Sequence, residues 1–536
     1  MGSVLRYCGP FAIAVMLAAC PAAATEPAAV DRILDAGMRQ GRVMDYAQHL
    51  SDTIGPRITN SPQAREAERW TADELRALGL SVRTEGFEFG PGWSKEHASL
   101  RMVSPRSLDL TAVPVAWTPP TAGAVTADII VAPMAVEADF ERWRGKLRGR
   151  LVLISDPDQA LVAPKTSARR FSDSDLAALS AYEPPQHGGA DIGEWFATYL
   201  SFNAKLDAFL AGEGAVGWAR MAKRSGQVVG EGYFHKAGQT PRLPGVEIAA
   251  VDYRRLVRLA RSGAVRLEMA NLVRFHAGDT KAYNIFGDLP GRDPAAGYVM
   301  AGTHLDSWGE GDGAADAGGN VAVVMEAARI LTSLGVKPRR TIRFALWGGE
   351  QQGLYGIQNY VERYLASRGR TGDEDPARRD YGRWEALYPI TPKPGYRDLA
   401  AYFCLDNGPG RIRGLYGEGA AQTTPILKEW LAPFAAFGAS TVSSQRRIES
   451  GHQYLQDIGL PGFQFIQDPI DPDHQIFQTR IDTLDALDPD DLRINAVILA
   501  TLLLAAAERE EPLPRRPVPN KPRSTVLSAG GVSAPE

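Results

Sequence analysis

The chain has 536 residues, a formal net charge of −4, and a hydrophobic fraction of 44%. A chain of this length exceeds one ordinary domain, so we expect two or three domains with enough apolar residues for real cores. The near-neutral charge gives no sign of a nucleic-acid partner.

The N-terminus has the pattern of a targeting segment: Arg6, an apolar run and then small residues. Residues 17–20 resemble a bacterial lipoprotein box, in which Cys20 would become the lipidated first residue, whereas residues 22–24 offer an ordinary cleavage site. Either route exports the protein, to the periplasm or as an outer-membrane lipoprotein, and the apolar run is too short for a stable membrane span. Cys404 then remains alone in the body of the chain, which excludes an internal disulfide.

The rest of the pattern predicts a main α/β domain interrupted by a second one. Residues 30–80 have helical periodicity and residues 81–115 alternate as strands do, before a Pro-Pro boundary. Short strands and helices then indicate an inserted mixed α/β domain. From Tyr283 strands alternate with helices, as in a mostly parallel sheet with helices on both faces. The predicted boundaries are 1–25 for the signal peptide, 26–120 and 276–510 for the main domain, 121–275 for the insert, and 511–536 for a disordered tail.

The strand predicted at residues 298–302 leads into side chains that could bind a metal ion. His304 and Asp306 follow this strand, and Asp316 stands near the start of the next helix. The imidazole could bind a metal such as zinc, the Asp316 carboxylate could bridge two metals, and Asp306 could orient the imidazole. A polar loop that caps a helix would give the same pattern.

Two further carboxylates follow predicted strands. Glu350 emerges after residues 341–347, where it could take a proton from a metal-bound water or simply cap a helix. Asp406 ends a buried strand, and because a buried charge is costly without a partner, a metal or an arginine beside it is favoured. Sites in open α/β sheets lie at the carboxyl edge of the strands, so we expect these groups near His304.

Several motifs follow one another in an order that resembles a known family. They are Ile-Gly-Pro-Arg at 54–57, His-Leu-Asp-Ser-Trp at 304–308, Trp-Gly-Gly-Glu at 347–350, Leu-Asp-Asn-Gly at 405–408 and Gly-Leu-Pro-Gly-Phe-Gln-Phe-Ile-Gln-Asp-Pro at 459–469. The chain resembles the zinc-dependent exopeptidases that include bacterial leucyl aminopeptidases, carboxypeptidase Q and glutamate carboxypeptidase II. The resemblance covers most of the mature chain. It implies a three-layer α/β fold, a protease-associated-like insert, and a peptide substrate.

The resemblance also implies a role for each matching residue. In that family two zinc ions share a bridging aspartate, which corresponds to Asp316, and one ion is completed by a histidine and an aspartate, which correspond to His304 and Asp406. The general base is the first carboxylate of a Glu-Glu pair, which corresponds to Glu350. The two metals acidify one water and polarise the scissile carbonyl, while the base carries a proton to the leaving amine.

The chain departs from the family at the second metal. The family's ligands there are the second Glu of the pair and a His, and the matching residues are Gln351 and Gln478. A neutral amide is a poor zinc ligand beside carboxylate or imidazole, so we expect one zinc ion and a weak or empty second site. An Asp that often follows the bridging residue is Ala317, which puts the strained peptide of the family in doubt. His452 and His474 are candidate replacement ligands.

These observations predict an exported zinc exopeptidase with a depleted second metal site. The alternative is a catalytically impaired homologue that serves as a binding module in the cell envelope. A glutaminyl-cyclase-like transferase is less favoured, because that relative holds its zinc with an Asp, Glu and His set of which this chain has lost two. Amino- versus carboxypeptidase action, the substrate sequence and the oligomeric state stay open.

Overall fold

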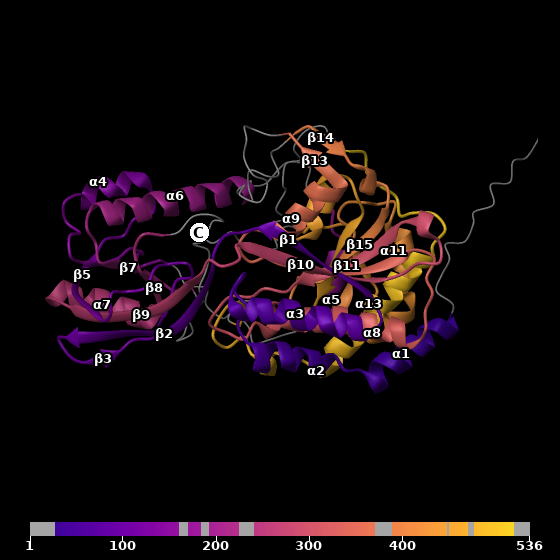
Figure 1. The fold of residues 1–536 in the computed structure, drawn as a ribbon, viewed down its shortest axis with the longest axis horizontal. Helices are drawn as coiled ribbons and strands as arrows, with labels where there is room; N and C mark the ends of the chain where they lie inside the picture. Colours follow the sequence, from indigo (N-terminus) through magenta and orange to yellow (C-terminus); the bar gives the residue numbers. More distant parts are fainter. Residues whose placement is uncertain are drawn as a thin grey trace, which may run out of the picture.

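The structure is a computed structural model that describes residues 27–159, 170–183, 192–223, 241–369, 388–447, 450–469 and 476–518. Within these ranges the strands form two eight-stranded sheets and one two-stranded sheet. Figure 1 shows one large sheet in each of two lobes, with the strands β11 (Tyr298–His304) and β15 (Leu399–Cys404) in the larger lobe. No helix in the described part of the chain is both long and apolar enough to cross a membrane.

The larger lobe is built on the sheet β1-β10-β12-β11-β15-β18-β16-β17. Its four parallel pairings include β12–β11, β11–β15 and β15–β18 at the centre, and its three antiparallel pairings lie toward the edges. The sheet is thus mixed with a parallel centre, as expected for the predicted α/β class. The strands are β1 (Ser81–Glu88), β10 (Lys281–Leu289), β11 (Tyr298–His304), β12 (Thr341–Trp347), β15 (Leu399–Cys404), β16 (Ile412–Tyr416), β17 (Thr441–Ser443) and β18 (Gly462–Gln467).

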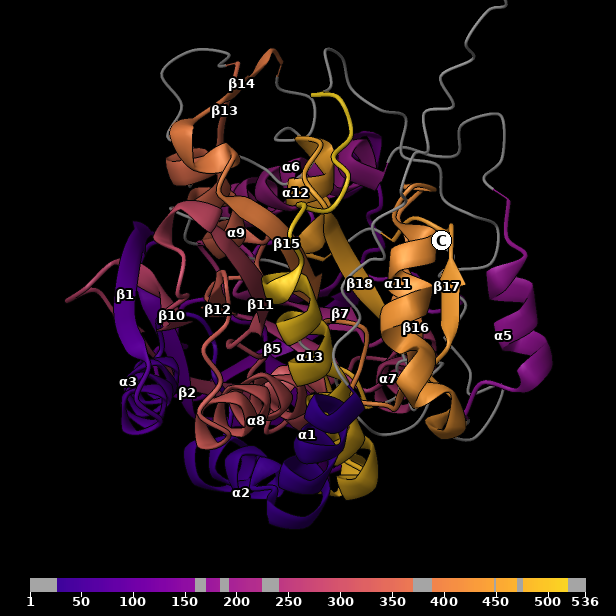
Figure 2. The same cartoon turned by 90° about the vertical axis from the view of Figure 1, so that its right-hand side faces the viewer.

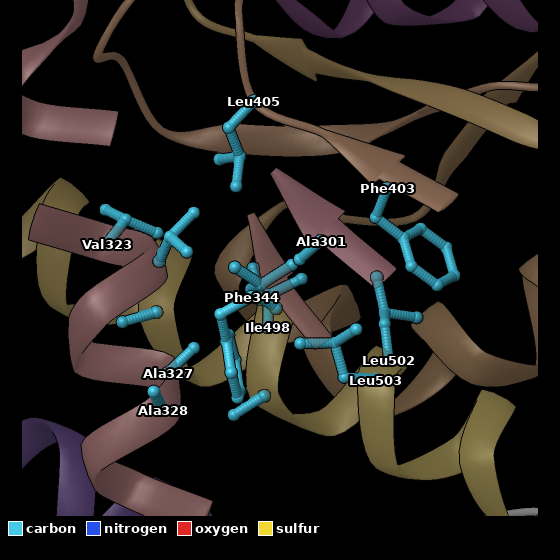
Figure 3. Close-up of a cluster of buried hydrophobic side chains, with 14 of the residues drawn as sticks. Ala301, Val323, Ala327, Ala328, Phe344, Phe403, Leu405, Ile498, Leu502 and Leu503 are labelled. Carbon is cyan, nitrogen blue, oxygen red and sulfur yellow. The ribbon is translucent and has the colours of Figure 1, made fainter. Parts of the chain in front are cut away.

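Helices cover both faces of this sheet (Figure 2). One face carries α1 (Pro27–Gln40), α2 (Val43–Gln48), α3 (Pro62–Ala77), α8 (Gly319–Ser333), α11 (Thr424–Leu431) and α13 (Pro489–Glu508), and the other carries α9 (Tyr355–Tyr360) and α12 (His452–Asp457). The helices α8 and α13 are apolar on nearly all sides because they are buried between the sheet and the outer helices. Figure 3 shows the core beneath them, where Val323 and Ile498 pack with Phe344 and Phe403.

The smaller lobe is the sheet β3-β2-β9-β5-β6-β7-β8-β4. Its strands are β2 (Gly92–Ser104), β3 (Leu108–Asp109), β4 (Ala112–Pro114), β5 (Val125–Val131), β6 (Leu151–Leu153), β7 (Gly217–Met221), β8 (Gly245–Ile248) and β9 (Arg266–His276), with helices α4 (Phe140–Trp143), α6 (Ile192–Gly212) and α7 (Ala250–Ser262). The sheet begins at Gly92, so the boundary predicted at residue 121 is wrong. The reason is that β2 pairs with the distant β9 along most of its length.

An arm of the insert reaches the larger lobe. Helix α5 (Asp173–Ser180) lies beside β17 (Figure 2), and Arg170, just before it, contacts the fully buried carboxylates of Asp468 and Asp491 at 3.1 and 2.6 Å. The small sheet of β13 (Ala366–Arg368) and β14 (Ile390–Pro392) completes the larger lobe.

The end of the chain differs from the prediction of disorder after residue 510. Residues 511–518 lie on the larger lobe, with Leu513 only 3% exposed. Arg515 donates to the carbonyls of Arg397 and Leu399, and Arg516 donates to the carbonyl of Glu418. A Pro- and Arg-rich segment can thus be ordered when one apolar side chain is buried and its arginines bind free carbonyls. Residues 519–536 lie outside the described residues.

Candidate metal centre

Three loops at the carboxyl edge of the parallel strands bring the predicted ligands together. His304 is the last residue of β11, and Asp406 stands two residues beyond the end of β15, the strand beside it. Asp316 lies in the segment Ala314–Gly318 that leads into α8, and its own backbone is not helical. One ligand atom from each of these side chains lies within 4.8 Å of the other two, and no other such group occurs among the described residues. The expected convergence is therefore present.

The distances within the centre suit a small cation. His304 Nε2 lies 3.1 Å from Asp316 Oδ1 and 3.3 Å from Asp406 Oδ1. Tetrahedral zinc with bonds of ~2.0–2.1 Å would hold its ligand atoms about 3.4 Å apart. The side chains of His304 and Asp316 are 1% and 4% exposed, against 14% for Asp406 and 11% for Glu350. The centre therefore opens to solvent on the side of Asp406 and Glu350.

The hydrogen bonding of His304 indicates what the centre binds. Its Nδ1 lies 2.8 Å from the backbone oxygen of Asp306, which can only accept, so Nδ1 carries the proton. The buried Nε2 faces two carboxylates, and it makes no hydrogen bond within the described residues. Burial lowers the pKa of His304, but Glu350, Asp316 and Asp406 raise it well above its usual range. The site therefore favours positive charge between the imidazole and the carboxylates, which a proton or a divalent cation such as zinc can supply.

Asp306 supports the centre differently from the prediction. We expected its side chain to orient the imidazole, but its backbone carbonyl does so. The carboxylate instead accepts hydrogen bonds from the backbone N–H groups of Glu350 and Gln351, at 3.1 and 3.0 Å. Asp306 therefore fixes the turn after β12 and with it the position of Glu350, whose Oε2 lies 3.9 Å from His304 Nε2.

The two glutamines occupy the other side of Asp316. Gln351 Nε2 donates to Asp316 Oδ2 at 2.8 Å, and Gln478 Nε2 donates to Gln351 Oε1 at 2.7 Å. The direction is fixed, because a carboxylate only accepts and so the amide that faces it must present its NH₂ group. We call this chain of two hydrogen bonds the amide relay. All three side chains are buried, and the residues here do not fit a second zinc ion.

Two residues that the sequence analysis did not single out hold the Asp316 loop in place. Asp482 accepts from the backbone N–H groups of Ala315 and Asp316, at 2.5 and 3.2 Å. Arg57, fully buried, donates to the carbonyls of Leu305 and Gly313, among others. Arg57 ends the Ile-Gly-Pro-Arg motif, and Asp482 lies four residues after Gln478. A search for charged residues that the fold would bury in these two stretches could have found both. The Asp316–Ala317 peptide is cis.

His452, one of the two candidate replacement ligands, does not join the centre. His452 is completely buried, and its Nε2 lies 3.0 Å from Glu418 Oε1. Burial lowers the pKa of His452, whereas Glu418 raises it, to about 9, so this histidine forms a buried ion pair. It is absent from the metal-binding group found in the described residues. His474 lies outside the described residues. Cys404 is a free, buried cysteine.

Comparison with known proteins agrees with this geometry. Residues 284–503 match the model of peptidase family M28. This stretch of the chain is therefore similar to that peptidase family. The match includes the strands and loops that supply His304, Asp316, Glu350 and Asp406, and it confirms the resemblance derived from the motifs.

The similarity to individual proteins extends beyond that region. Carboxypeptidase Q of Mus musculus is 23% identical over 498 residues, covering 89% of this chain and 88% of that protein. The crystal structure of a peptidase M28 precursor from Shewanella amazonensis has a TM-score of 0.64 at 22% identity and covers 92% of this chain and 98% of its own. A zinc aminopeptidase from Bacillus subtilis has a TM-score of 0.55 at 17% identity, covering 88% and 95%. The fold is thus shared along most of the chain.

Proposed function

We propose that the protein is an exported metallo-exopeptidase that hydrolyses a peptide bond near a free terminus. The observation that carries the proposal is the convergence of His304 Nε2 with one carboxylate oxygen each of Asp316 and Asp406, at 3.1 and 3.3 Å. Three protein ligands and an open fourth position describe many catalytic zinc sites. The M28 match and the zinc aminopeptidase and carboxypeptidase relatives support the same activity.

Zinc, when bound, supplies Lewis acidity toward the substrate carbonyl and toward a water molecule. Glu350 lies at the open side of the centre, where its carboxylate can accept a proton from that water and donate it to the leaving amine. Burial, together with Asp406, raises the pKa of Glu350 well above its usual range, and the positive charge of a bound zinc ion would lower it toward the range in which the carboxylate can act as a base. The hydrogen bonds from the 350–351 turn to Asp306 keep this carboxylate in place.

We propose further that the chain works with one zinc ion. The amide relay turns an NH₂ group, rather than a lone pair, toward the second oxygen of Asp316. A second ion there would meet a donor of positive partial charge and would gain only neutral amide oxygens as replacements. Zinc content close to one ion per chain is the expected result.

Export and membrane attachment are also part of the proposal. The support is the N-terminal targeting pattern, including Cys20 as a lipidation site, and these residues lie outside the described ones. The second sheet, from Gly92 to His276, would be the protease-associated-like insert. Periplasmic or outer-membrane residence follows if the signal is used.

The test combines metal analysis with an exopeptidase assay. Zinc-loaded protein should release amino acids from short peptides, and Glu350→Gln should keep its zinc yet lose about 10²–10⁴-fold in kcat, the usual contribution of a general base. Glu141→Gln, the same change at a side chain 73% exposed in the insert, is the matched control and should match the wild type. If the loaded protein binds peptides but never cleaves them, the alternative of a binding module in the cell envelope replaces this proposal.

A further inference from the structure

The chain between His304 and Asp316 joins two of the three ligands of the centre. We call residues 305–315 the metal loop. Part of this loop is held from within the larger lobe, where Arg57 donates to the carbonyl of Asp312 at 2.8 Å. Because the loop ends at a ligand on each side, the position of the loop sets how the two ligands meet.

Glu310, in the middle of the metal loop, faces the smaller lobe. Its Oε1 forms an ion pair with Nζ of Lys95, which lies on β2. Its Oε2 lies 4.0 Å from Nη2 of Arg480, in the loop that follows Gln478. The Glu310 side chain is only 6% exposed, against 32% for Lys95 and 42% for Arg480. A nearly buried carboxylate between two cations therefore joins the metal loop to the smaller lobe.

A second contact between the metal loop and the smaller lobe lies two residues before Glu310. The ring of Trp308 packs edge-on against the ring of Trp117, with the ring centroids 6.3 Å apart. Both rings are buried in one apolar cluster, which also contains Trp93 from the same strand as Lys95. The metal loop is thus fastened to the smaller lobe by an apolar contact and by an ion pair.

The burial of Glu310 gives its ion pair more weight than an exposed pair has. A carboxylate that loses its cation while it stays buried is costly, so the loop would shift to bring it to solvent. The next residue, Gly311, packs so closely on the Thr479 carbonyl that a Cβ atom would not fit there. A shift of Glu310 therefore moves the loop as a whole. Metal ligands must be held to within about 0.5 Å of their working geometry, so such a movement weakens metal binding.

We propose that Lys95, acting through Glu310, is a positioning residue of the zinc site, so that the smaller lobe sets the zinc affinity of the larger one. This inference rests on the proposed zinc site and adds a supporting contact from the other lobe. Lys95 acts on the metal loop and touches neither the metal nor the substrate. By linkage, bound zinc strengthens the contact between the lobes by the same factor by which that contact strengthens zinc binding.

The test is a double-mutant cycle on zinc affinity, measured by competition with a chromophoric chelator in wild type, Lys95→Gln, Glu310→Gln and the double variant. Changes in a coupled contact of this kind alter binding by roughly two- to thirtyfold. Each single variant should weaken zinc binding within that range. In the Glu310→Gln background, Lys95→Gln should have no further effect, because its partner is already gone. Lys95→Arg keeps the cation and should keep most of the affinity.

Lys205→Gln is the matched control. Lys205 also pairs with a glutamate, Glu137, but both side chains are more than half exposed and both belong to the smaller lobe. This variant should bind zinc as the wild type does. Thermal unfolding of the zinc-free proteins separates positioning from folding, and Lys95→Gln should unfold close to the wild type because a partly exposed ion pair contributes little to stability.

Two results would overturn the inference. One is a Lys95→Gln variant that is less stable without zinc but binds zinc as tightly as the wild type. The other is an equal effect of Lys95→Gln with and without Glu310. Peptide cleavage with a zinc affinity that ignores Lys95 refutes this inference alone, whereas the expected cycle in a protein that never cleaves peptides refutes the proposed peptidase function alone.

Discussion

The two carboxylate oxygens of Asp316 divide the centre into two halves, and the surroundings of the buried oxygen differ between them. The Oδ1 atom faces His304, which lies beside Asp406, whereas Oδ2 accepts the NH₂ group of Gln351. In the first half the imidazole of His304 converges with the carboxylates of Asp316 and Asp406. In the second half Gln478 completes a closed chain of hydrogen bonds. A buried carboxylate is stabilised by a cation or by hydrogen-bond donors. The Oδ1 side of Asp316 faces the proposed cation position, and its Oδ2 accepts from an amide donor.

The difference shows how a metal position can be lost without loss of the fold. The amide relay keeps every buried polar group partnered and needs no ion, so the loop around Asp316 stays in place. A hydrogen bond to a charged group contributes about 1.5–3 kcal/mol. A metal entering the second half would have to break one such bond and reverse the Gln351 amide, whereas a metal entering the first half breaks none.

Removing one group from each half should give the largest contrast. His304→Ala deletes the nitrogen ligand, and we expect at least a hundredfold weaker zinc binding and loss of peptide cleavage. Gln351→Ala deletes a donor, and zinc content should stay near one ion per chain with activity within about tenfold of the wild type. Metal analysis after dialysis measures both. Equal zinc loss in the two variants would mean that the halves are not distinct.

Restoring the second half should add a metal. The double variant Gln351→Glu with Gln478→His places a negative charge and a nitrogen ligand beside Asp316 Oδ2. Zinc content should therefore rise from one to two ions per chain. Each single variant serves as a control and should stay closer to one. Two tightly bound ions in the native protein would show that the amide relay does not exclude the metal.

The two halves also differ in what the sequence could predict. His304 and Asp406 follow apolar runs, Asp316 stands near the start of a helix, and parallel strands end at one edge, so their convergence follows from local patterns. The relay joins side chains from three distant segments, and only their packing sets which amide donates. The boundary near Gly92 was missed for a similar reason, since β2 finds its partner β9 some 170 residues later. Resemblance marked the glutamines as substitutions but not as a hydrogen-bonded unit.

Asp482, beside the second half, should make the zinc-free protein sensitive to pH. Burial, with Asp316 next to it, raises the pKa of this carboxyl from 3.8 to about 7. Between about pH 4 and 7 the folded state holds a proton on Asp482 that the unfolded state has released. The contribution of this carboxyl to the free energy of unfolding is therefore greatest below pH 4 and falls as the pH rises toward 7. The loss is on the order of 2–4 kcal/mol.

Denaturant unfolding of chelator-treated protein across that pH range measures the effect. Asp482→Asn cannot titrate, so its stability should fall less steeply than that of the wild type, and the comparison of slopes cancels any constant cost of the substitution. Zinc in the first half brings positive charge close to Asp316 and should reduce the difference. Parallel curves for the zinc-free pair would assign the pH dependence to other groups.

The smallest effect should come from the outer end of the amide relay. Gln478→Ala removes the donor to Gln351 Oε1 but leaves the bond from Gln351 to Asp316, so the buried amide oxygen loses its partner at a cost of about 1 kcal/mol. Thermal unfolding should shift by only about one degree in a chain of this length, while zinc affinity changes little, since the first half is untouched. Gln40→Ala, at the exposed end of α1, is the control for the loss of a glutamine side chain. A large fall in zinc affinity in Gln478→Ala alone would mean that the relay holds Asp316 for the metal, and the two halves would then act as one unit.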